Sequence, residues 1–242
     1  MSEPVLHVKE LHYTYSDGTC ALRGIDLTIA RGEKVGLVGG NGSGKSTLLM
    51  CINGLFLSQG TVRVAGVELT AGRAKEIRGR VGLVFQSADD QLFMPTLADD
   101  LAFGPINLGL SETQAQQRVA ESAEQMGLTE LLGRAPHHLS MGQKRNAAIA
   151  SVLALRPEIL LMDEPSSSLD PRSRRRLITV LASLNTTMLI ASHDLAMVAA
   201  LCPRVAVIDD GRIVANGSTA DIFRNAVLME KHGLEAWPQD GS

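Results

Sequence analysis

The sequence predicts an α/β fold with an antiparallel β region at the N-terminus and an α-helical subdomain inserted into the core. Short, β-rich and partly alternating stretches occupy residues 5–15, 23–38 and 60–70, which indicates the β region. Five apolar runs without alternation are separated by helical pattern, which is typical of strands buried on both faces of a sheet. Residues 97–153 show helical spacing and no strand signal, so they predict the inserted helices.

The predicted elements follow one another in a definite order. In the β region, the stretch VAGV places Gly66 at a tight hairpin turn. The buried strands are predicted at KVGLVGG, VGLVFQ, EILLMDE, TTMLIASH and RVAVIDD. Between the second and third of these runs, SETQAQQRVAESAEQMGL has the apolar spacing of a helix. We therefore expect a single domain, in which residues 1–90 and 154–242 form the core with the β region and residues 91–153 form the helical subdomain.

The composition limits the size and the partners of the molecule. With 242 residues and 45% hydrophobic content, the chain can bury a sizeable core as one large domain or two small ones. A net charge of −3 gives no electrostatic reason to expect a nucleic-acid partner, because strong phosphate-backbone binders concentrate positive charge. The three cysteines form no metal-binding pattern. No leader pattern and no apolar run of ~18 residues is present, so we expect neither secretion nor a membrane span.

The stretch GGNGSGKST, directly after the first buried strand, fits the pattern of a phosphate-binding loop. Its glycines let backbone N–H groups converge on phosphate oxygens, and the following helix start adds its positive dipole end. Lys45 is expected to neutralise the β- and γ-phosphates, and the Ser46 hydroxyl to ligate Mg²⁺. A simple anion-binding turn is the alternative, but the full motif between a strand and a helix favours the core of a P-loop NTPase. The residues predicted to hold the nucleotide here are Gly39, Gly40, Asn41, Gly42, Ser43, Gly44, Lys45, Ser46 and Thr47.

Carboxylates end a second buried strand, at ILLMDEP. Asp163 is expected to hold the Mg²⁺ shell, and Glu164 to act as the base for a water that attacks the γ-phosphate. Alone, such a pair is a common polar strand exit, but a phosphate loop upstream favours the catalytic interpretation. His193 follows another apolar strand, in LIASHD, where it either contacts the γ-phosphate, orients the water or is only a polar loop residue.

A helix start in the inserted segment also has the means to bind an anion. Ser140 and Gln143 match the S-x-x-Q capping box, whose helix offers oriented N–H donors and a hydroxyl. Gly142 leaves room for a close approach. This helix start lies far along the chain from the phosphate loop, so it need not reach the phosphate loop of its own chain.

The segment LSMGQKRNAAIASVLALRPEILLMDEPSSSLD resembles the ATP-binding cassette (ABC) family, the ATP-hydrolysing subunits of ABC transporters, whose signature is LSGGQ. The resemblance covers nearly the whole chain. It implies ATP and Mg²⁺ as cofactors and a second ATPase subunit, identical or a close paralogue, whose signature completes each site across a head-to-tail dimer. Met141 replaces the first signature glycine. The resemblance adds Tyr15 as the adenine-stacking aromatic, Gln86 as the Q-loop residue, Ser140, Gly142 and Gln143 as trans contacts to ATP, and Ser168 to Asp170 as the D-loop. Together the predicted catalytic residues are Glu164, His193, Gln86 and Lys45, and the predicted metal ligands are Ser46, Gln86 and Asp163.

The stretch QSADDQLFMPTLADDLAFGPINLGL resembles, more narrowly, the ATPases of energy-coupling-factor importers, which serve cobalt, nickel, biotin and other vitamins. The family implies that this segment receives a coupling helix from a membrane subunit. We expect a docking groove lined by Phe93, Met94, Leu97, Leu101 and Phe103 with Asp89, Asp90, Asp99 and Asp100 on its rim, while the alternative places some of these apolar residues in the core.

These observations predict an ATPase subunit that powers import through separate transmembrane subunits, with cobalt, nickel or a vitamin such as biotin as the cargo. Such a subunit is expected at the cytoplasmic face of the cell membrane, as a peripheral protein. The alternative is a non-transport cassette ATPase that acts with soluble partners in repair, translation or iron–sulfur assembly. That class usually carries tandem cassettes or long insertions, and neither is seen in this sequence.

Overall fold

The computed structural model describes residues 4–235. An antiparallel sheet near the N-terminus has the order β2-β1-β4-β5, and a second sheet of six strands has the order β10-β9-β3-β8-β7-β6. The first sheet consists of β1 (Leu6–Thr14), β2 (Cys20–Ile29), β4 (Gln59–Val64) and β5 (Val67–Glu68). Because β4 and β5 pair antiparallel around Gly66, the predicted hairpin is confirmed. The mixed α/β fold with an antiparallel β region and inserted helices is likewise confirmed.

The six-stranded sheet contains the five predicted apolar runs. They form the parallel strands β3 (Lys34–Val38), β6 (Val81–Val84), β7 (Ile159–Asp163), β8 (Thr187–Ala191) and β9 (Arg204–Asp209). Successive residues of β7 pack into two different hydrophobic clusters, Ile159 and Leu161 into one, Leu160 and Met162 into the other. Burial on both faces therefore explains why these runs lack alternation.

The edge strand β10 (Arg212–Ser218) has no counterpart in the sequence prediction. It pairs antiparallel with β9, and none of its residues is fully buried. An edge strand of this kind carries little apolar signal, and its position is set by the turn at Asp210 and Gly211, both with positive φ.

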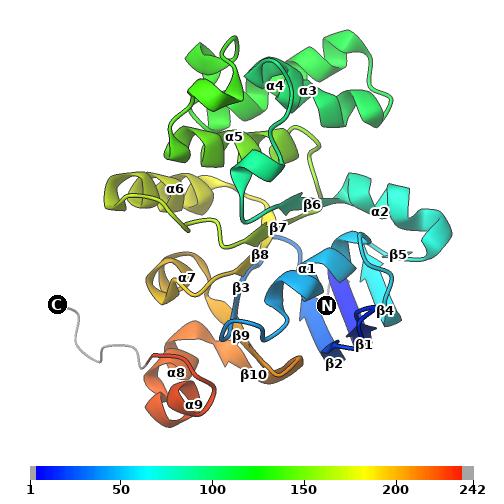
Figure 1. Cartoon of the computed structure of the whole chain (residues 1–242), viewed down its shortest axis with the longest axis vertical. Helices are drawn as coiled ribbons and strands as arrows, with labels where there is room; N and C mark the ends of the chain where they lie inside the picture. Colours follow the sequence, from blue (N-terminus) through cyan, green and yellow to red (C-terminus); the bar gives the residue numbers. More distant parts are fainter. Residues whose placement is uncertain (1–3, 236–242) are drawn as a thin grey trace.

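Helices cover the two faces of the large sheet (Figure 1). On one side, α1 (Lys45–Asn53) lies between the two sheets and shares a hydrophobic cluster with both. On the other side, α6 (Pro171–Ser183) and α7 (Leu195–Leu201) pack on the strands. The remaining helices near the sheets are α2 (Ala74–Arg80), α8 (Thr219–Arg224) and α9 (Ala226–Lys231), with a 3₁₀ turn at Ala71–Arg73.

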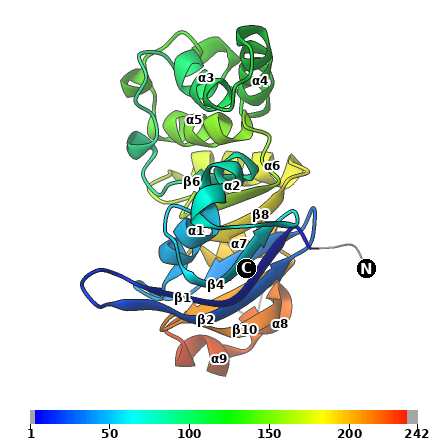
Figure 2. The same cartoon turned by 90° about the vertical axis from the view of Figure 1, so that its right-hand side faces the viewer.

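The inserted segment forms a helical layer at one end of the molecule, opposite the N-terminal sheet (Figures 1 and 2). It contains α3 (Leu97–Asn107), α4 (Glu112–Gln125) and α5 (Met141–Leu153), with 3₁₀ turns at Thr129–Leu131 and Pro136–His138, and a further 3₁₀ turn at Ala88–Asp90 precedes it. Ser111 and Ser140 each close a capping box with the glutamine three residues later, so the box predicted at α5 is confirmed.

The expectation of a groove after Gln86 is wrong for three of its predicted residues and stays a prediction for the others. Phe93 and Phe103 are 63% and 43% exposed, and their rings meet edge to face at 5.0 Å. Leu97 and Leu101 are 0% exposed and belong to the core of the helical layer, because they lie on the inward face of α3. Asp100 is also buried and not on a rim, since its Oδ1 accepts hydrogen bonds from the backbone N–H groups of Phe93 (3.0 Å) and Met94 (3.1 Å).

Candidate active site

The phosphate-loop segment connects β3 to α1 at the carboxyl edge of the parallel strands. Gly39 is required sterically, since a Cβ there would lie 2.1 Å from the carbonyl oxygen of Ile208. Gly44 precedes α1 with a φ of 107°, a conformation that favours glycine. The loop therefore aims the free N–H groups of the first turn of α1 at one point, as an anion site requires.

Lys45 lies at the centre of this loop. It is 7% exposed, and its Nζ donates hydrogen bonds to the carbonyl oxygens of Gly39 (2.8 Å) and Gly40 (3.0 Å). Burial lowers its pKa, and the nearby carboxylates of Glu164 and Asp163 partly oppose this. Because carbonyl oxygens carry no net charge, they do not neutralise the buried ammonium group that they hold. Its positive charge can therefore attract a phosphate oxygen.

Asp163, the last residue of β7, has a carboxylate that suits a divalent cation. Its Oδ1 is buried and has no hydrogen-bond partner among the described residues. Burial raises the pKa of Asp163, although a hydrogen bond with the Ser46 side chain acts in the opposite direction. An unpartnered carboxylate oxygen beside a serine hydroxyl is a donor set that Mg²⁺ prefers, so these two residues fit the ion.

Glu164 lies one residue beyond the strand, with a φ of 47° that glutamate rarely adopts. Its carboxylate is buried and accepts hydrogen bonds from Ser192 Oγ (3.1 Å) and from the backbone N–H of His193 (3.1 Å). His193 Nδ1 lies 2.8 Å from Glu164 Oε2. The loop after β8 therefore fixes the position of a carboxylate that has an imidazole as its direct neighbour.

A cavity of about 560 Å³ collects most of the predicted site residues. The hydroxyl of Tyr15 lies 2.8 Å from Thr47 Oγ1, and its ring meets Tyr13 edge to face, so the aromatic group stands at a fixed place beside the loop. The cavity is lined by Tyr15, Thr19, Cys20, Ala21, Asn41, Gly42, Ser43, Gly44, Lys45, Ser46, Thr47, Gln86, Asp163, Glu164 and His193. Thr19, Cys20 and Ala21 were not predicted, because the start of β2 carries no motif.

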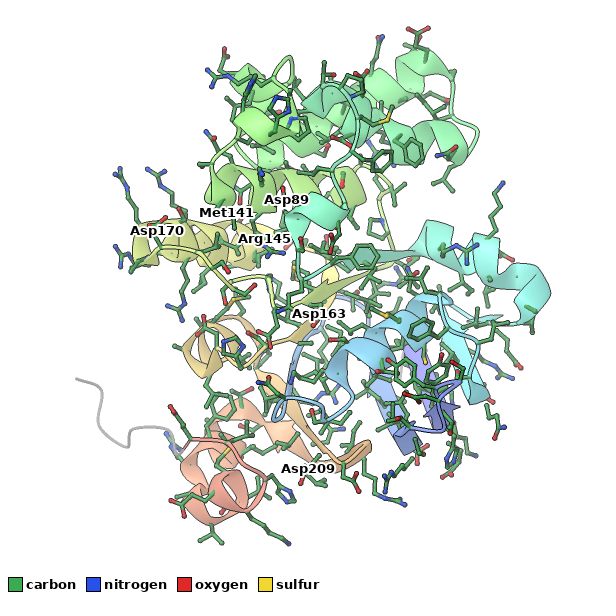
Figure 3. The ribbon with its side chains drawn as sticks, viewed as in Figure 1. Asp89, Met141, Arg145, Asp163, Asp170 and Asp209 are labelled. Atoms are coloured by element: carbon green, nitrogen blue, oxygen red, sulfur yellow. The ribbon has the colours of Figure 1, made fainter. Side chains whose placement is uncertain are left out.

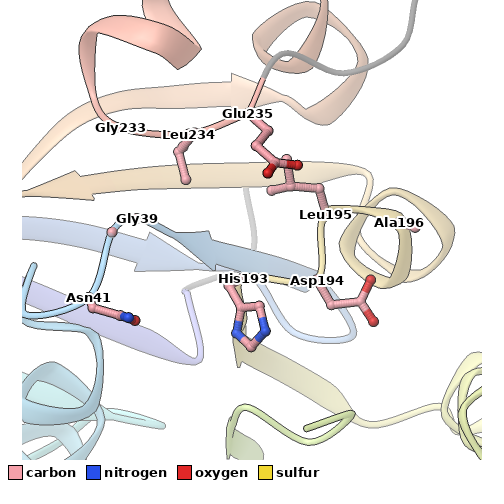
Figure 4. A pocket seen from close by; sticks show the side chains of 10 residues that line it. Gly39, Asn41, His193, Asp194, Leu195, Ala196, Gly233, Leu234 and Glu235 are labelled. Atoms are coloured by element: carbon pink, nitrogen blue, oxygen red, sulfur yellow. The ribbon is translucent and has the colours of Figure 1, made fainter. Parts of the chain in front are cut away.

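A second cavity, also about 560 Å³, lies on the other side of His193 (Figure 4). Gly39, Gly40 and Asn41 form one wall of it, and His193 to Ala196 form another. The segment Gly233 to Glu235 closes it from the C-terminal side. Asn41 and His193 border both cavities, so a group bound in the second cavity would lie next to one bound in the first.

The residues of the α5 helix start, Ser140, Gly142 and Gln143, do not line the cavity that holds the phosphate loop. Ser140 Oγ accepts a hydrogen bond from the N–H of Gln143 (3.3 Å), and Gln143 Oε1 accepts one from the N–H of Ser140 (2.9 Å). Met141, at the start of α5, is 56% exposed to solvent and lies apart from Asp163 (Figure 3). The predicted signature is therefore accessible, but not to the phosphate loop of its own chain.

Comparisons with known proteins agree with this geometry. The family described as ABC transporter matches residues 22–167. A protein of Gloeobacter violaceus named as an ABC transporter ATP-binding protein is 50% identical over 238 residues, which are 97% of this chain and 97% of that protein. The energy-coupling factor transporter ATP-binding protein of Methanothermobacter thermautotrophicus is 44% identical over 236 residues, 95% of this chain and 76% of that one.

Solved structures with the same fold lead to the same family. The protein cbiO1 from Clostridium perfringens, described as part of the ABC transporter complex cbiONQ, superimposes with a TM-score of 0.84 at 35% identity, over 95% of this chain and 94% of that one. A dimeric ATP-binding cassette in a post-hydrolysis state, bound to ADP and Pi, superimposes with a TM-score of 0.78 at 27% identity, over 88% and 98%. The chain therefore belongs to the ABC transporter family, has the ABC ATPase fold and is an ATP-binding subunit that hydrolyses ATP.

Proposed function

We propose that this subunit powers an importer of the energy-coupling-factor type, whose cargo is a cobalt or nickel ion or a vitamin such as biotin. The observation that carries the proposal is the short segment that joins the nucleotide cavity, at Gln86, to the exposed ring pair of Phe93 and Phe103. The relatives named as an energy-coupling factor ATPase and as part of cbiONQ support the importer type. None of the relatives described above supports a non-transport cassette ATPase.

The proposed hydrolysis uses the residues that meet around the cavity. Lys45 and the N–H groups of the phosphate loop bind the β- and γ-phosphates, Tyr15 stacks on adenine, and Ser46 and Asp163 hold Mg²⁺ together with Gln86. The bound ion supplies neutralisation of the phosphate charge. Glu164 takes a proton from the attacking water. His193, whose Nδ1 lies 2.8 Å from the Glu164 carboxylate, orients this water toward the γ-phosphate.

We further propose that two copies, or this chain and a close paralogue, act as a head-to-tail dimer. The support is twofold: the Ser140 helix start does not line the nucleotide cavity of its own chain, and a relative of the same fold is a dimer in its post-hydrolysis state. Residues 91–153 then serve as the signature subdomain, presenting Ser140, Gly142 and Gln143 to the ATP of the partner, while residues 1–90 and 154–242 form the nucleotide-binding core.

Mixing two inactive variants is expected to restore activity if the site is composite. Lys45→Ala leaves the phosphate charge uncompensated, and Ser140→Arg blocks the helix start, so each homodimer should be inactive. A mixed dimer contains one undamaged site. ATPase activity of the mixture above that of either variant, with heterodimers quantified by differently tagged subunits, is the expected result. Activity that stays at background while ATP-dependent heterodimers form would contradict independent composite sites.

The proposed location is the cytoplasmic face of the cell membrane, where the subunit is held by transmembrane partners and not by a span of its own. Within residues 4–235, no helix combines the length and apolar character that a bilayer crossing needs. No nucleic-acid partner is proposed, in keeping with the net charge of −3.

Purification from membranes tests the importer assignment. The tagged chain, extracted with mild detergent, is expected to carry an integral membrane protein with it, and cells lacking the chain should lose uptake of cobalt, nickel or biotin. Lys45→Ala should still assemble but should not restore uptake. Recovery of soluble partners only, with normal uptake in the deletion strain, would overturn the importer proposal while leaving the ATPase assignment intact.

A further inference from the structure

The backbone of Phe85 is held in an unusual way. Strand β6 ends at Val84, so the next residue no longer bonds to the sheet. Its N–H donates to Gln91 Oε1 (3.2 Å), and its carbonyl oxygen accepts a hydrogen bond from Arg145 Nη1 (2.8 Å). Both backbone groups of the residue before Gln86 are therefore satisfied by side chains and not by a neighbouring strand.

Arg145 makes the larger part of this connection. It lies in the second turn of α5, is 5% exposed, and donates from Nη2 to the carbonyl oxygen of Gln86 (2.5 Å) as well as toward Ser167 Oγ (3.5 Å). In Figure 3 it points from α5 down to the loop that follows β6, between Met141 and Asp163. Within residues 4–235 Arg145 forms no ion pair. Its guanidinium instead donates hydrogen bonds to the consecutive carbonyl oxygens of Phe85 and Gln86.

Gln91 ties the same loop to α5 from the other side. Its Nε2 donates to the carbonyl oxygen of Ala148 (2.7 Å) and to Ser151 Oγ (3.0 Å) while its Oε1 receives the Phe85 N–H. Lys144 adds an ion pair to Asp89 at 2.6 Å. Residues 85–91 are thus bonded to four residues of α5, Lys144, Arg145, Ala148 and Ser151, and α5 begins at the signature.

We propose that Arg145 is a positioning residue for ATP hydrolysis: it holds the Phe85 and Gln86 carbonyls against α5, and this sets where the Gln86 side chain stands at the nucleotide cavity. The proposal rests on the proposed role of Gln86. Its physical basis is the planar guanidinium, whose N–H groups donate to two adjacent carbonyl oxygens at once. The compact ammonium group of a lysine lacks this fixed fork of donors and holds two carbonyls less well. Gln86 borders both the nucleotide cavity and the cleft beside Arg145, so a shift of its backbone moves the side chain in the cavity.

The test measures ATPase kinetics of the purified full chain. Arg145→Ala is expected to lower kcat tenfold or more and to leave the KM for ATP within about twofold, because the phosphate loop and Tyr15 are untouched. Arg145→Lys, which keeps the charge, is expected to recover part of kcat. Arg78→Ala is the matched control. Arg78 also donates to a backbone carbonyl, that of Gly54 (3.1 Å) at the end of α1, but it does not line the nucleotide cavity. The kcat of this variant should equal that of the wild type.

A double-mutant cycle with Gln86→Ala separates positioning from general damage. If Arg145 acts through Gln86, the double variant should hydrolyse ATP no more slowly than Gln86→Ala alone. Losses that multiply, or wild-type kcat in Arg145→Ala, would overturn the proposal and leave the function proposed above untouched. Full turnover in Gln86→Ala would overturn both this proposal and the proposed role of Gln86. If Arg145→Ala melts below the assay temperature, Arg145→Lys takes its place in the same cycle with the same criteria.

Discussion

Replacing Glu164 by Gln is expected to lower kcat of ATP hydrolysis by about 10²–10⁴-fold, the range that a positioned general base contributes. The amide keeps the shape of the side chain and still accepts hydrogen bonds from Ser192 and from the His193 N–H, but it cannot take a proton from water. ATP binding should persist, since the phosphate loop is unchanged. The variant should therefore accumulate as an ATP-bound dimer, measured by size-exclusion chromatography with ATP and Mg²⁺.

Glu158→Gln provides the matched control for this experiment. Glu158 stands just before the same strand, at its opposite end, and forms a surface ion pair with Arg31 at 2.6 Å. Such exposed pairs contribute at most about 1 kcal/mol, so kcat should be unchanged. Wild-type turnover in Glu164→Gln would show that this carboxylate is not the base. Loss of ATP binding would show instead that it supports the loop and not the chemistry.

Changing both exposed rings, Phe93→Asp with Phe103→Asp, is expected to abolish assembly with the membrane partner while the subunit stays folded. The rings are 63% and 43% exposed, so charges there remain in water, and the loss is limited to an edge-to-face contact of about 0.5–1.5 kcal/mol. For a chain of this size the melting temperature should fall by only a few degrees, at about 2–4 °C per kcal/mol. ATP binding should be retained.

Leu97→Asp is the opposing case on the same stretch. Leu97 is 0% exposed, and an unpaired carboxylate in that core costs several kcal/mol, which lowers the melting temperature by about 10 °C or more or prevents folding. Thermal unfolding of the isolated subunits, beside a pull-down of the membrane partner, distinguishes the two positions. A folded ring variant that still assembles and supports uptake would exclude this surface as the docking site.

Much of the site was predictable from the sequence because it depends on local geometry. The phosphate loop requires glycines between a strand and a helix, and that requirement is written within nine consecutive residues, Gly39 to Thr47. The carboxylates and His193 follow buried strands, and parallel strands bring their carboxyl ends to one edge, where the structure places them around a single cavity. The capping box at Ser140 was readable for the same reason, since both partners lie three residues apart.

The features that the sequence did not predict depend on which face of a helix or strand packs against another part of the molecule. Leu97 and Phe103 lie on the same helix, α3, yet one is in the core and the other in water, and Asp100 is buried because two N–H groups turn back to it. The wall formed by Gly233 to Glu235 is distant in sequence from the loop that it faces. In the sequence, Arg145 is an ordinary charged residue of a helix. Only the packing of α5 against the end of β6 brings the carbonyl oxygens of Phe85 and Gln86 within hydrogen-bond distance of it. The sequence alone determined the fold class and the parts of the site that are built from residues close together in the chain. Tertiary packing decided which side chains are buried, which segments form the cavity walls and which distant segments share hydrogen bonds. These features depend on contacts that no local pattern encodes.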